Sequence, residues 1–255
     1  MNAFFSIVII CKNAAEHIAV TIKSIEHLSD DIIIYDTGST DNTMAIAGKY
    51  PVQLYSGPWE GYGKSRCRAT EKAKYNWVFT IDSDEIAEPS LQKELAQLTP
   101  DDQKIVYAVR LRNFIGDKEL RWGEWGNDFR PRLFHKAYCH WDEAIIHEKP
   151  VLSAGTSVKR LKGTIHHQYA NDLKHYREKL WRYGLLTAEK YFAADKKPTL
   201  LKKYLSPLYA FTKAYIVRLG FLDGHTGFKV ALTTARYTFL KYARLSELRK
   251  QPSIL

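Results

Sequence analysis

Residues 77–84 read WVFTIDSD, an apolar strand-like run that ends in two acids separated by a serine. Side chains two positions apart on an extended chain point to the same side, so Asp82 and Asp84 can aim at one point in space. Two carboxylates at the open end of a buried strand suit a hard divalent cation that carries a diphosphate. An isolated Asp-x-Asp is also an ordinary surface turn. The elements that precede it decide between these two interpretations.

Three strand–helix pairs lead up to this run. The predicted strands are 4–10, 32–35, 52–55 and 77–81, and the predicted helices begin at Asn13, at about Ser39 and at Lys64. Asn13 with Glu16 three residues later has the form of a capping box, and Ser39 with Thr40 is typical of a helix start. Strand–helix alternation of this kind predicts a parallel sheet with helices on both faces.

Polar residues follow three of the predicted strands. Lys12–Asn13 follows the first, Asp36 ends the second, and Asp82 with Asp84 ends the last. In open parallel sheets ligands bind beyond the carboxyl ends of the strands, so we expect these groups to converge on one edge. Asp36 can accept hydrogen bonds from a uracil ring or a ribose, whereas Ser39–Asp41 are expected to be structural.

Beyond Glu85 the alternation stops. The predicted elements there are a helix at 91–98, strands at 104–112, 132–134 and 159–167, a Gly- and Trp-rich loop at 122–130, and helices at 173–193, 200–219 and 228–248, the last two separated by Gly220 and Gly224. The expected fold class is α/β, a Rossmann-like mixed sheet flanked by helices, with a C-terminal helical extension. We expect a domain at 1–168, with halves at 1–86 and 87–168, followed by a basic helical extension at 169–255.

The helical extension carries an uneven share of the charge. The chain of 255 residues has a formal net charge of +10, and residues 199–245 hold eight Lys or Arg and one acid, Asp223, among many Tyr, Phe and Leu residues. A basic, aromatic helical segment is typical of a surface for anionic lipid or another acidic partner. Nucleic acid is the competing partner for a basic protein, and a packed subdomain with solvated lysines is the simplest alternative.

Cysteine usage and hydropathy indicate a cytoplasmic protein. Cys11, Cys67 and Cys139 are far apart and form neither a zinc pattern nor a disulfide framework. The N-terminus shows no secretory signal, and no segment has the unbroken apolar length needed to cross a bilayer. We therefore expect a cytoplasmic location, with or without peripheral attachment to the inner face of the inner membrane.

Residues 4–86 resemble the nucleotide-sugar half of family-2 glycosyltransferases. The matching segments are SIVIICKN (6–13), DTGSTD (36–41) and WVFTIDSDE (77–85). Three further segments resemble the branch of the family that includes the lipopolysaccharide-core β-glucosyltransferases. They are GPWEG (57–61), RPRLF (130–134) and IHE (146–148), and this match runs to about residue 192. The resemblance implies a GT-A fold, a divalent Mn²⁺ or Mg²⁺, and an inverting transfer of a hexose from a UDP-sugar to a lipid-linked or lipopolysaccharide-core glycan.

Carried over position by position, the resemblance implies donor-binding roles for the strand-end residues. Asp36 would hold the uridine, Asp82 would touch the ribose or the metal side, and Asp84 would be the main metal ligand. Arg66 would lie near the base or the diphosphate, and Lys12–Asn13 would line the same nucleotide site. The residue after Arg66 is usually an asparagine in the family and is a cysteine here, which leaves the role of that asparagine open.

An inverting transfer needs a general base on the acceptor side of the sugar. The resemblance favours Glu148, because related enzymes place an acid in this region. Asp142 and Glu143 are near enough in sequence to compete, and Glu148 can instead be a solvated loop carboxylate. His147 would position Glu148 or contact a diphosphate oxygen, unless it is simply a hydrogen-bonded polar residue.

The remaining candidates have two interpretations each. His167 would be a third metal ligand or a diphosphate contact, or else a packing residue at the entry of the long helix. Trp122 and Trp125 would form a stacking floor for a sugar, or belong to a core. Arg130 and Arg132 would pair with acceptor phosphates, or bridge carboxylates.

Two other classes of function use parts of the same pattern. A nucleotidyl or phosphoryl transferase would use the two carboxylates, but it would want a Gly/Arg/Lys-rich loop where this chain has only Lys12. A non-catalytic binder of nucleic acid or glycan would use the basic helices or the Trp-rich loop. The expected partners are a UDP-sugar donor, a glycan or glycolipid acceptor and at most an anionic membrane surface; nucleic acid is not expected.

Overall fold

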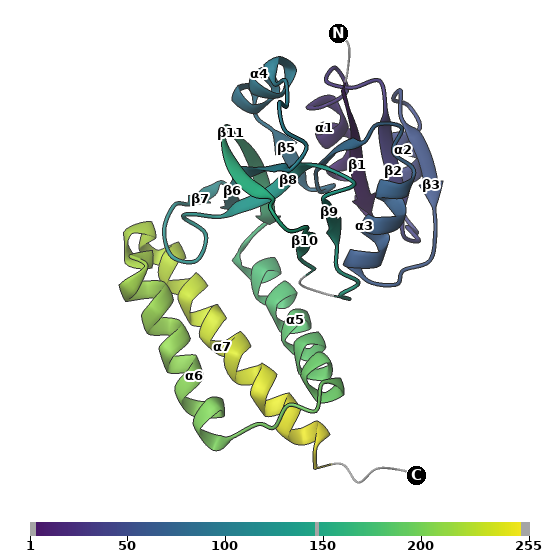
Figure 1. Ribbon diagram of the computed structural model, residues 1–255. Coiled ribbons are helices and arrows are strands. Elements are labelled where there is room, and N and C mark those ends of the chain that lie inside the picture. Colours follow the sequence, from purple (N-terminus) through teal and green to yellow (C-terminus); the bar gives the residue numbers. More distant parts are fainter. Residues whose placement is uncertain (1–3, 146–147, 251–255) are drawn as a thin grey trace, which may run out of the picture. The chain divides into compact units, whose positions relative to one another are not determined.

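A computed structural model describes residues 4–145 and 148–250 of the chain (Figure 1). The chain forms two compact units. The first comprises Met1–Leu111 with Phe129–His167, and the second comprises Arg112–Asp128 with Gln168–Leu255. The second unit thus holds a segment from the middle of the chain as well as the C-terminal helices. The predicted boundary at residue 168, between a glycosyltransferase-like domain and a basic helical extension, stays a prediction.

Residues 5–80 build the parallel part of a sheet, in the spatial order β3-β2-β1-β4. Its strands are β1 (Phe5–Cys11), β2 (Ile32–Asp36), β3 (Gln53–Ser56) and β4 (Trp77–Thr80). Every residue of β1 and β2 is buried, as expected for central strands that are covered on both faces. Cys11 lies opposite Asp36 in the register, so the carboxyl ends of β1 and β2 are level with each other.

Helices cover both faces of this parallel part, as predicted. They are α1 (Ile18–Lys23), α2 (Thr43–Ala47) and α3 (Tyr62–Glu71). The apolar residues of α1 and α2 join the core that contains Ile7 and Ile9, whereas α3 joins the core that contains Val8 and Ile10. The alternation of side chains along β1 therefore separates the two cores.

The predicted helix starts at Asn13 and Ser39 are wrong, since α1 begins at Ile18 and α2 at Thr43. Asn13 has a φ of 52°, a left-handed conformation that asparagine tolerates. Its Oδ1 accepts a hydrogen bond from the Thr40 N–H (2.8 Å), and its own N–H donates to Ser39 Oγ (2.8 Å). These side chains tie the loop after β1 to the loop after β2 instead of capping helices.

The rest of the sheet continues from β4 in the order β8-β6-β11-β5, and it is antiparallel at the pairs β4–β8, β6–β8, β6–β7 and β11–β5. A separate antiparallel pair is formed by β9 and β10. The elements are β5 (Glu85–Ala87), α4 (Pro89–Gln97), β6 (Ile105–Ile115), β7 (Lys118–Leu120), β8 (Phe129–His135), β9 (Cys139–Trp141), β10 (Pro150–Leu152) and β11 (Ser157–Ala170). The predicted α/β class, a mixed sheet flanked by helices, is confirmed. The short strands β5, β7, β9 and β10 were not predicted.

Helices make up most of the second unit. They are α5 (Leu173–Ala193), α6 (Leu200–Thr212), a π-helical segment (Lys213–Val217), a 3-10 turn (Gly220–Asp223) and α7 (Gly224–Leu248). Gly220 and Gly224 separate α6 from α7 as predicted, but α7 begins one turn earlier than expected, at Gly224. A Cβ on Gly220 would lie 2.5 Å from the Ala214 carbonyl oxygen, which explains the glycine. Within the described ranges, no helix combines the length and the apolar character needed to cross a membrane.

Candidate active site

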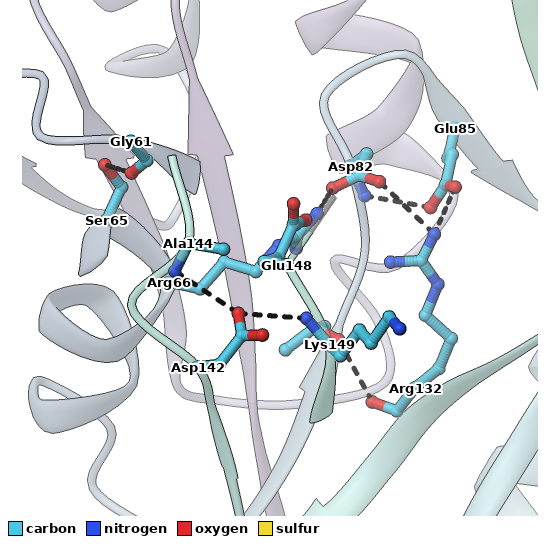
Figure 2. Close-up of polar contacts among 11 residues, drawn as sticks. Gly61, Ser65, Arg66, Asp82, Glu85, Arg132, Asp142, Ala144, Glu148 and Lys149 are labelled. Atoms are coloured by element: carbon cyan, nitrogen blue, oxygen red, sulfur yellow. Dashed lines mark hydrogen bonds and ion pairs between the residues drawn. The ribbon is translucent and has the colours of Figure 1, made fainter. Parts of the chain in front are cut away.

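Arg66, on α3, lies at the centre of a buried ion-pair network in the first unit (Figure 2). Its Nη2 donates to Asp82 Oδ1 (2.6 Å), and its Nε donates to Glu148 Oε1 (3.0 Å). The Arg66 side chain is only 7% exposed, and its guanidinium lies 4.8 Å from the centroid of the Trp141 ring. One side chain thus joins the predicted donor site to the predicted general base.

Arg132 and Glu85 complete the network (Figure 2). Arg132 Nη2 donates to Asp82 Oδ2 (3.2 Å) and to Glu85 Oε1, and Glu85 Oε2 accepts from the Asp82 N–H (2.9 Å). Both side chains are buried. Of the two interpretations of Arg132, the structure therefore has the bridge between carboxylates, of which Glu85 is buried and Asp82 is 28% exposed.

The charges of this network set the state of its acids. Burial by itself would raise the pKa of Asp82, yet Arg66 and Arg132 together hold that pKa well below its usual range. Burial raises the pKa of Glu85, Arg132 opposes that rise, and the neighbouring Asp82 charge adds to it. Asp82 is thus the firmly ionised member of the pair at neutral pH.

Asp84 and His167 come together beside this network. Asp84 Oδ2 lies 3.7 Å from His167 Nε2. The pairing of β11 with β5 explains the approach, because His167 lies opposite Glu85 in the register, one residue after Asp84. A carboxylate oxygen and an imidazole nitrogen are donors that divalent metals such as Mn²⁺ accept. Among the residues that the structure describes, no three His, Cys, Asp or Glu side chains form a group that could hold a metal by themselves.

Asp36 is buried at the end of β2, where its carboxylate organises the following turn. It accepts hydrogen bonds from the Gly38 N–H (3.1 Å) and the Ser39 N–H (3.0 Å). Cys11 Sγ lies 3.7 Å from Asp36 Oδ1 as a donor, and burial followed by the Asp36 charge raises the pKa of Cys11 to about 12. The thiol therefore keeps its proton and its hydrogen bond at neutral pH.

Lys12 and Asn13 follow β1 at the same edge, and they differ in role. Asn13 is occupied in the tie between the two loops. Lys12 is exposed, and its Nζ lies 5.9 Å from the centroid of the Trp59 ring, which is itself 40% exposed. The Trp59 ring meets Tyr62 edge to face at 4.8 Å. Lys12 and Trp59 thus offer a cation and an aromatic face to solvent.

The three candidate bases have different surroundings. Asp142 Oδ1 accepts from the N–H groups of Lys149 (3.1 Å) and Ala144 (3.3 Å), so it shapes the loop between β9 and β10. Glu143 is 76% exposed and pairs with Lys64 at 3.6 Å. Glu148 is 15% exposed and is the one of the three that Arg66 links to Asp82. His147 lies outside the described residues.

Residues 6–156 match the family model described as "Glycosyl transferase family 2". The chain belongs to this family. The lipopolysaccharide core biosynthesis glycosyltransferase LpsC of Rhizobium meliloti (strain 1021) is 27% identical over 96% of this chain and 94% of its own length. Family membership favours a glycosyltransferase over the nucleotidyl or phosphoryl transferase and the non-catalytic binder that the sequence left open.

Two solved structures are also similar to this family-2 glycosyltransferase. S. aureus TarS, residues 1–349, has a TM-score of 0.48 at 12% identity, covering 98% of this chain and 93% of its own. Glucosyl-3-phosphoglycerate synthase from Mycobacterium tuberculosis, in complex with Mn²⁺, UDP and phosphoglyceric acid, has a TM-score of 0.35 at 26% identity over 44% of each chain. The GT-A type that the resemblance implied stays a prediction.

Two glycines that no site prediction used bring α3 of the glycosyltransferase against the loop before Glu148. The N–H of Tyr62 donates to the Ile145 carbonyl (3.0 Å), and the N–H of Gly63 donates to the Ala144 carbonyl (3.0 Å). A Cβ on Gly63 would lie 1.8 Å from the Asp142 carbonyl oxygen, and one on Gly61 would lie 2.5 Å from the Ile145 Cα. The Gly-Tyr-Gly sequence at 61–63 is the signal that could have predicted this close approach.

Cys67 stands where the family usually has an asparagine. Its Sγ donates to the Trp141 carbonyl oxygen at 3.3 Å. The cysteine therefore contacts β9 at Trp141, the same residue whose ring lies against Arg66.

The predicted sugar-stacking residues Trp122 and Trp125 belong to the second unit. Trp122 is 41% exposed, and Trp125 packs against Tyr169 with their centroids 4.5 Å apart. Arg130 lies in the first unit, on β8 opposite Val109, with an exposed side chain. These three residues stay predictions for the acceptor side.

Proposed function

We propose that this glycosyltransferase moves a hexose from a UDP-sugar, with inversion at the anomeric carbon, to a lipopolysaccharide-core or lipid-linked glycan in the cytoplasm. The observation that carries the proposal is the Arg66 bridge between Asp82 and Glu148. One guanidinium thus contacts both Asp82, at the end of the strand that we assign to the donor, and Glu148, in the loop between β9 and β10. The similarity to LpsC supports the acceptor class.

Glu148 is the general base of this proposal. The acceptor hydroxyl oxygen attacks C1 of the sugar while the bond from C1 to the diphosphate oxygen breaks. The electron pair of that bond leaves with UDP, and the hydroxyl proton passes to the Glu148 carboxylate. Arg66 orients this carboxylate through Nε, which leaves Glu148 Oε2 for the hydroxyl.

Asp84 and His167 are the proposed holders of Mn²⁺ or Mg²⁺. Their oxygen and nitrogen donors fit such a cation, and diphosphate and water oxygens would supply the remaining ligands. When bound, the cation would offset the charge of the diphosphate leaving group. Asp82 would touch the ribose or the metal side, Asp36 would accept from the uracil, and Lys12 would attract the phosphates.

Replacing Glu148 tests the proposal most directly. Transfer is measured as UDP release from a panel of UDP-hexoses in the presence of lipopolysaccharide core. Glu148→Gln should lower kcat by about 10²–10⁴-fold, the usual contribution of a general base, while UDP binding persists. Glu143→Gln, at an exposed acid of the same loop, is the matched control and should stay within a few-fold of wild type. Undiminished transfer by a folded Glu148→Gln variant would remove this base from the mechanism.

A further inference from the structure

The outer side of α6 in the second unit is apolar. Six large apolar or aromatic side chains of this helix recur at helical spacing, and each is at least 53% exposed. They are Leu200, Leu201, Tyr204, Leu205, Leu208 and Tyr209, and we call them the α6 face. A solvent-facing helix normally turns charged and polar residues outward, so a stripe of this size calls for a partner.

The α6 face differs from the side of the helix that packs within the unit, except at Tyr204, whose ring meets Phe239 of α7 with centroids 6.1 Å apart. Residues of the helix that lie outside the stripe, such as Pro207 and Phe211, are partly buried. The Phe211 ring meets Phe228 of α7 edge to face, with centroids 5.9 Å apart. None of the residues of α6, all of which the structure describes, is fully buried. The helix is therefore apolar both where it packs and where it does not.

The charges along this segment are all positive. Residues 200–222 include Lys202, Lys203, Lys213 and Arg218 and contain no Asp or Glu. The nearest acid in sequence, Asp223, is buried and accepts the N–H groups of residues 121 and 122. From elsewhere in the unit, the Glu124 carboxylate lies 3.8 Å from Arg218 Nη1.

Two of these lysines lie along the aromatic rings of the α6 face. Lys203 Nζ is 5.5 Å from the centroid of the Tyr204 ring, and Lys213 Nζ is 5.6 Å from that of Tyr209. Tyrosine and lysine both have an apolar body and a polar tip, so such pairs suit the boundary between hydrocarbon and water. With 13 residues, α6 is about 20 Å long at 1.5 Å per residue, too short to span a bilayer but long enough to lie on one.

We propose that the α6 face docks on a bilayer that contains anionic phospholipid, with the helix lying in the plane of the headgroups. The apolar stripe would enter the acyl boundary while Lys202, Lys203 and Lys213 meet the lipid phosphates. A second copy of this chain fits less well, because a two-fold contact would place the same lysines of both copies against each other. This inference deepens the proposed function, since a lipid-linked or lipopolysaccharide-core acceptor lies at such a surface.

Vesicle flotation with the full chain tests the docking. Wild type should float with vesicles of phosphatidylcholine and phosphatidylglycerol, and bind vesicles of phosphatidylcholine alone more weakly. The double variant Leu205→Glu/Leu208→Glu should bind anionic vesicles at least about tenfold more weakly, because it puts acids on the apolar stripe. The double variant Val20→Glu/Val158→Glu changes two side chains of the first unit that are 49% and 50% exposed, and it should float as wild type does.

Three outcomes would overturn the docking. Wild type that fails to float, or an α6 variant that floats as well as wild type while keeping its melting temperature, would remove the lipid surface as the partner. Light scattering that shows a wild-type dimer which the α6 variant loses, without vesicle binding by either, would assign the face to a second copy. Glu148→Gln should float normally, so a failure of the proposed reaction and a failure of the docking can be told apart.

Discussion

Arg66 is buried, and its positive charge compensates part of the negative charge of Asp82 and Glu148. Arg66→Ala leaves Glu148 without its guanidinium and Asp82 with Arg132 alone. Breaking a buried ion pair from one side costs about 3–5 kcal/mol of unfolding free energy, which urea denaturation would measure. Arg68→Ala, on the same helix, removes a pair with Glu60 in which the arginine is 46% exposed, and it should cost about 1 kcal/mol or less. Equal losses of unfolding free energy in the two variants would mean that the Arg66 network stabilises the fold no more than an exposed ion pair does.

Because of Glu119 in the second unit, we expect the free energy of unfolding to fall at acid pH. Arg112 donates from Nε and Nη2 to its two oxygens (2.9 and 3.0 Å), and Arg121 Nε donates to Oε2 (3.0 Å). The hydrogen bonds from Arg112 outweigh burial and, with those from Arg121, lower the pKa of Glu119 to about 2. Because the unfolded pKa is about 4.3, Glu119 stabilises the folded state above that pH and loses this effect as the pH falls toward 2.

Glu119→Gln should therefore flatten the loss of stability on acidification. Thermal unfolding of wild type and variant, measured in steps from about pH 5 to about pH 2.5, would show a steeper decline for wild type. Parallel declines would mean that the two arginines do not bind this carboxylate more tightly in the folded state than in the unfolded one.

At this same scale the sequence predicted the strand-end acids but not their partners. Asp82 and Asp84 could be predicted because a buried strand must end where its apolar run ends. Arg66 meets acids 16 and 82 positions away, and no spacing rule connects residues so distant in the chain. The choice of Glu148 over Asp142 depends on hydrogen bonds that turn Asp142 into a loop-shaping residue, and these require the folded backbone.

Gly63 couples α3 to the loop before Glu148. Its Cα hydrogen occupies the place where a Cβ would lie 1.8 Å from the Asp142 carbonyl oxygen. Gly63→Ala must push the two backbones apart, at a cost of about 1–3 kcal/mol for overpacking, and it would move Arg66 away from Glu148. Both the unfolding free energy and kcat should fall. Gly48→Ala, at the end of α2 with 3.3 Å to the nearest oxygen, is the control and should leave kcat unchanged. A fully active Gly63→Ala would show that this approach does not position the base.

Elements with a strong periodic pattern were predictable, and elements fixed by tertiary contacts were not. The bounds of α5 agree with the prediction because its cap, Asp172, bonds the N–H of His175 as local sequence suggests. The predicted cap at Asn13 failed because a loop 26 or 27 residues away offers it partners. The three-residue strands β5, β7, β9 and β10 are too short to show a period.

At the scale of the whole molecule, the parallel part of the sheet could be predicted and the antiparallel part could not. Repeated strand–helix pairs determine a parallel sheet with its ligand edge at the strand ends, and the observed order β3-β2-β1-β4 follows that rule. The antiparallel half obeys no such rule. It brings β11 beside β5, and so His167 to Asp84, across nearly a third of the chain. That residues 112–128 join the C-terminal helices in one unit could not be predicted either, because the Gly- and Trp-rich composition from residue 122 onward indicates a loop but not the elements that it contacts.

The metal role of Asp84 predicts a linked response to UDP and Mn²⁺. A ligand that binds only the folded state stabilises it by about 2.7 kcal/mol at a hundredfold excess over Kd, so UDP with Mn²⁺ should raise the Tm of wild type by several degrees. EDTA should remove the part of this rise that depends on the metal. Asp84→Asn should lose the same part, because an amide oxygen is a weaker ligand for Mn²⁺ than a carboxylate. Asp101→Asn, at an acid of the same unit that is 80% exposed and lies 4.0 Å from Lys159, should respond as wild type does. If UDP and Mn²⁺ stabilise Asp84→Asn as strongly as wild type, the cation is held elsewhere, and the Asp84–His167 pair is a structural contact.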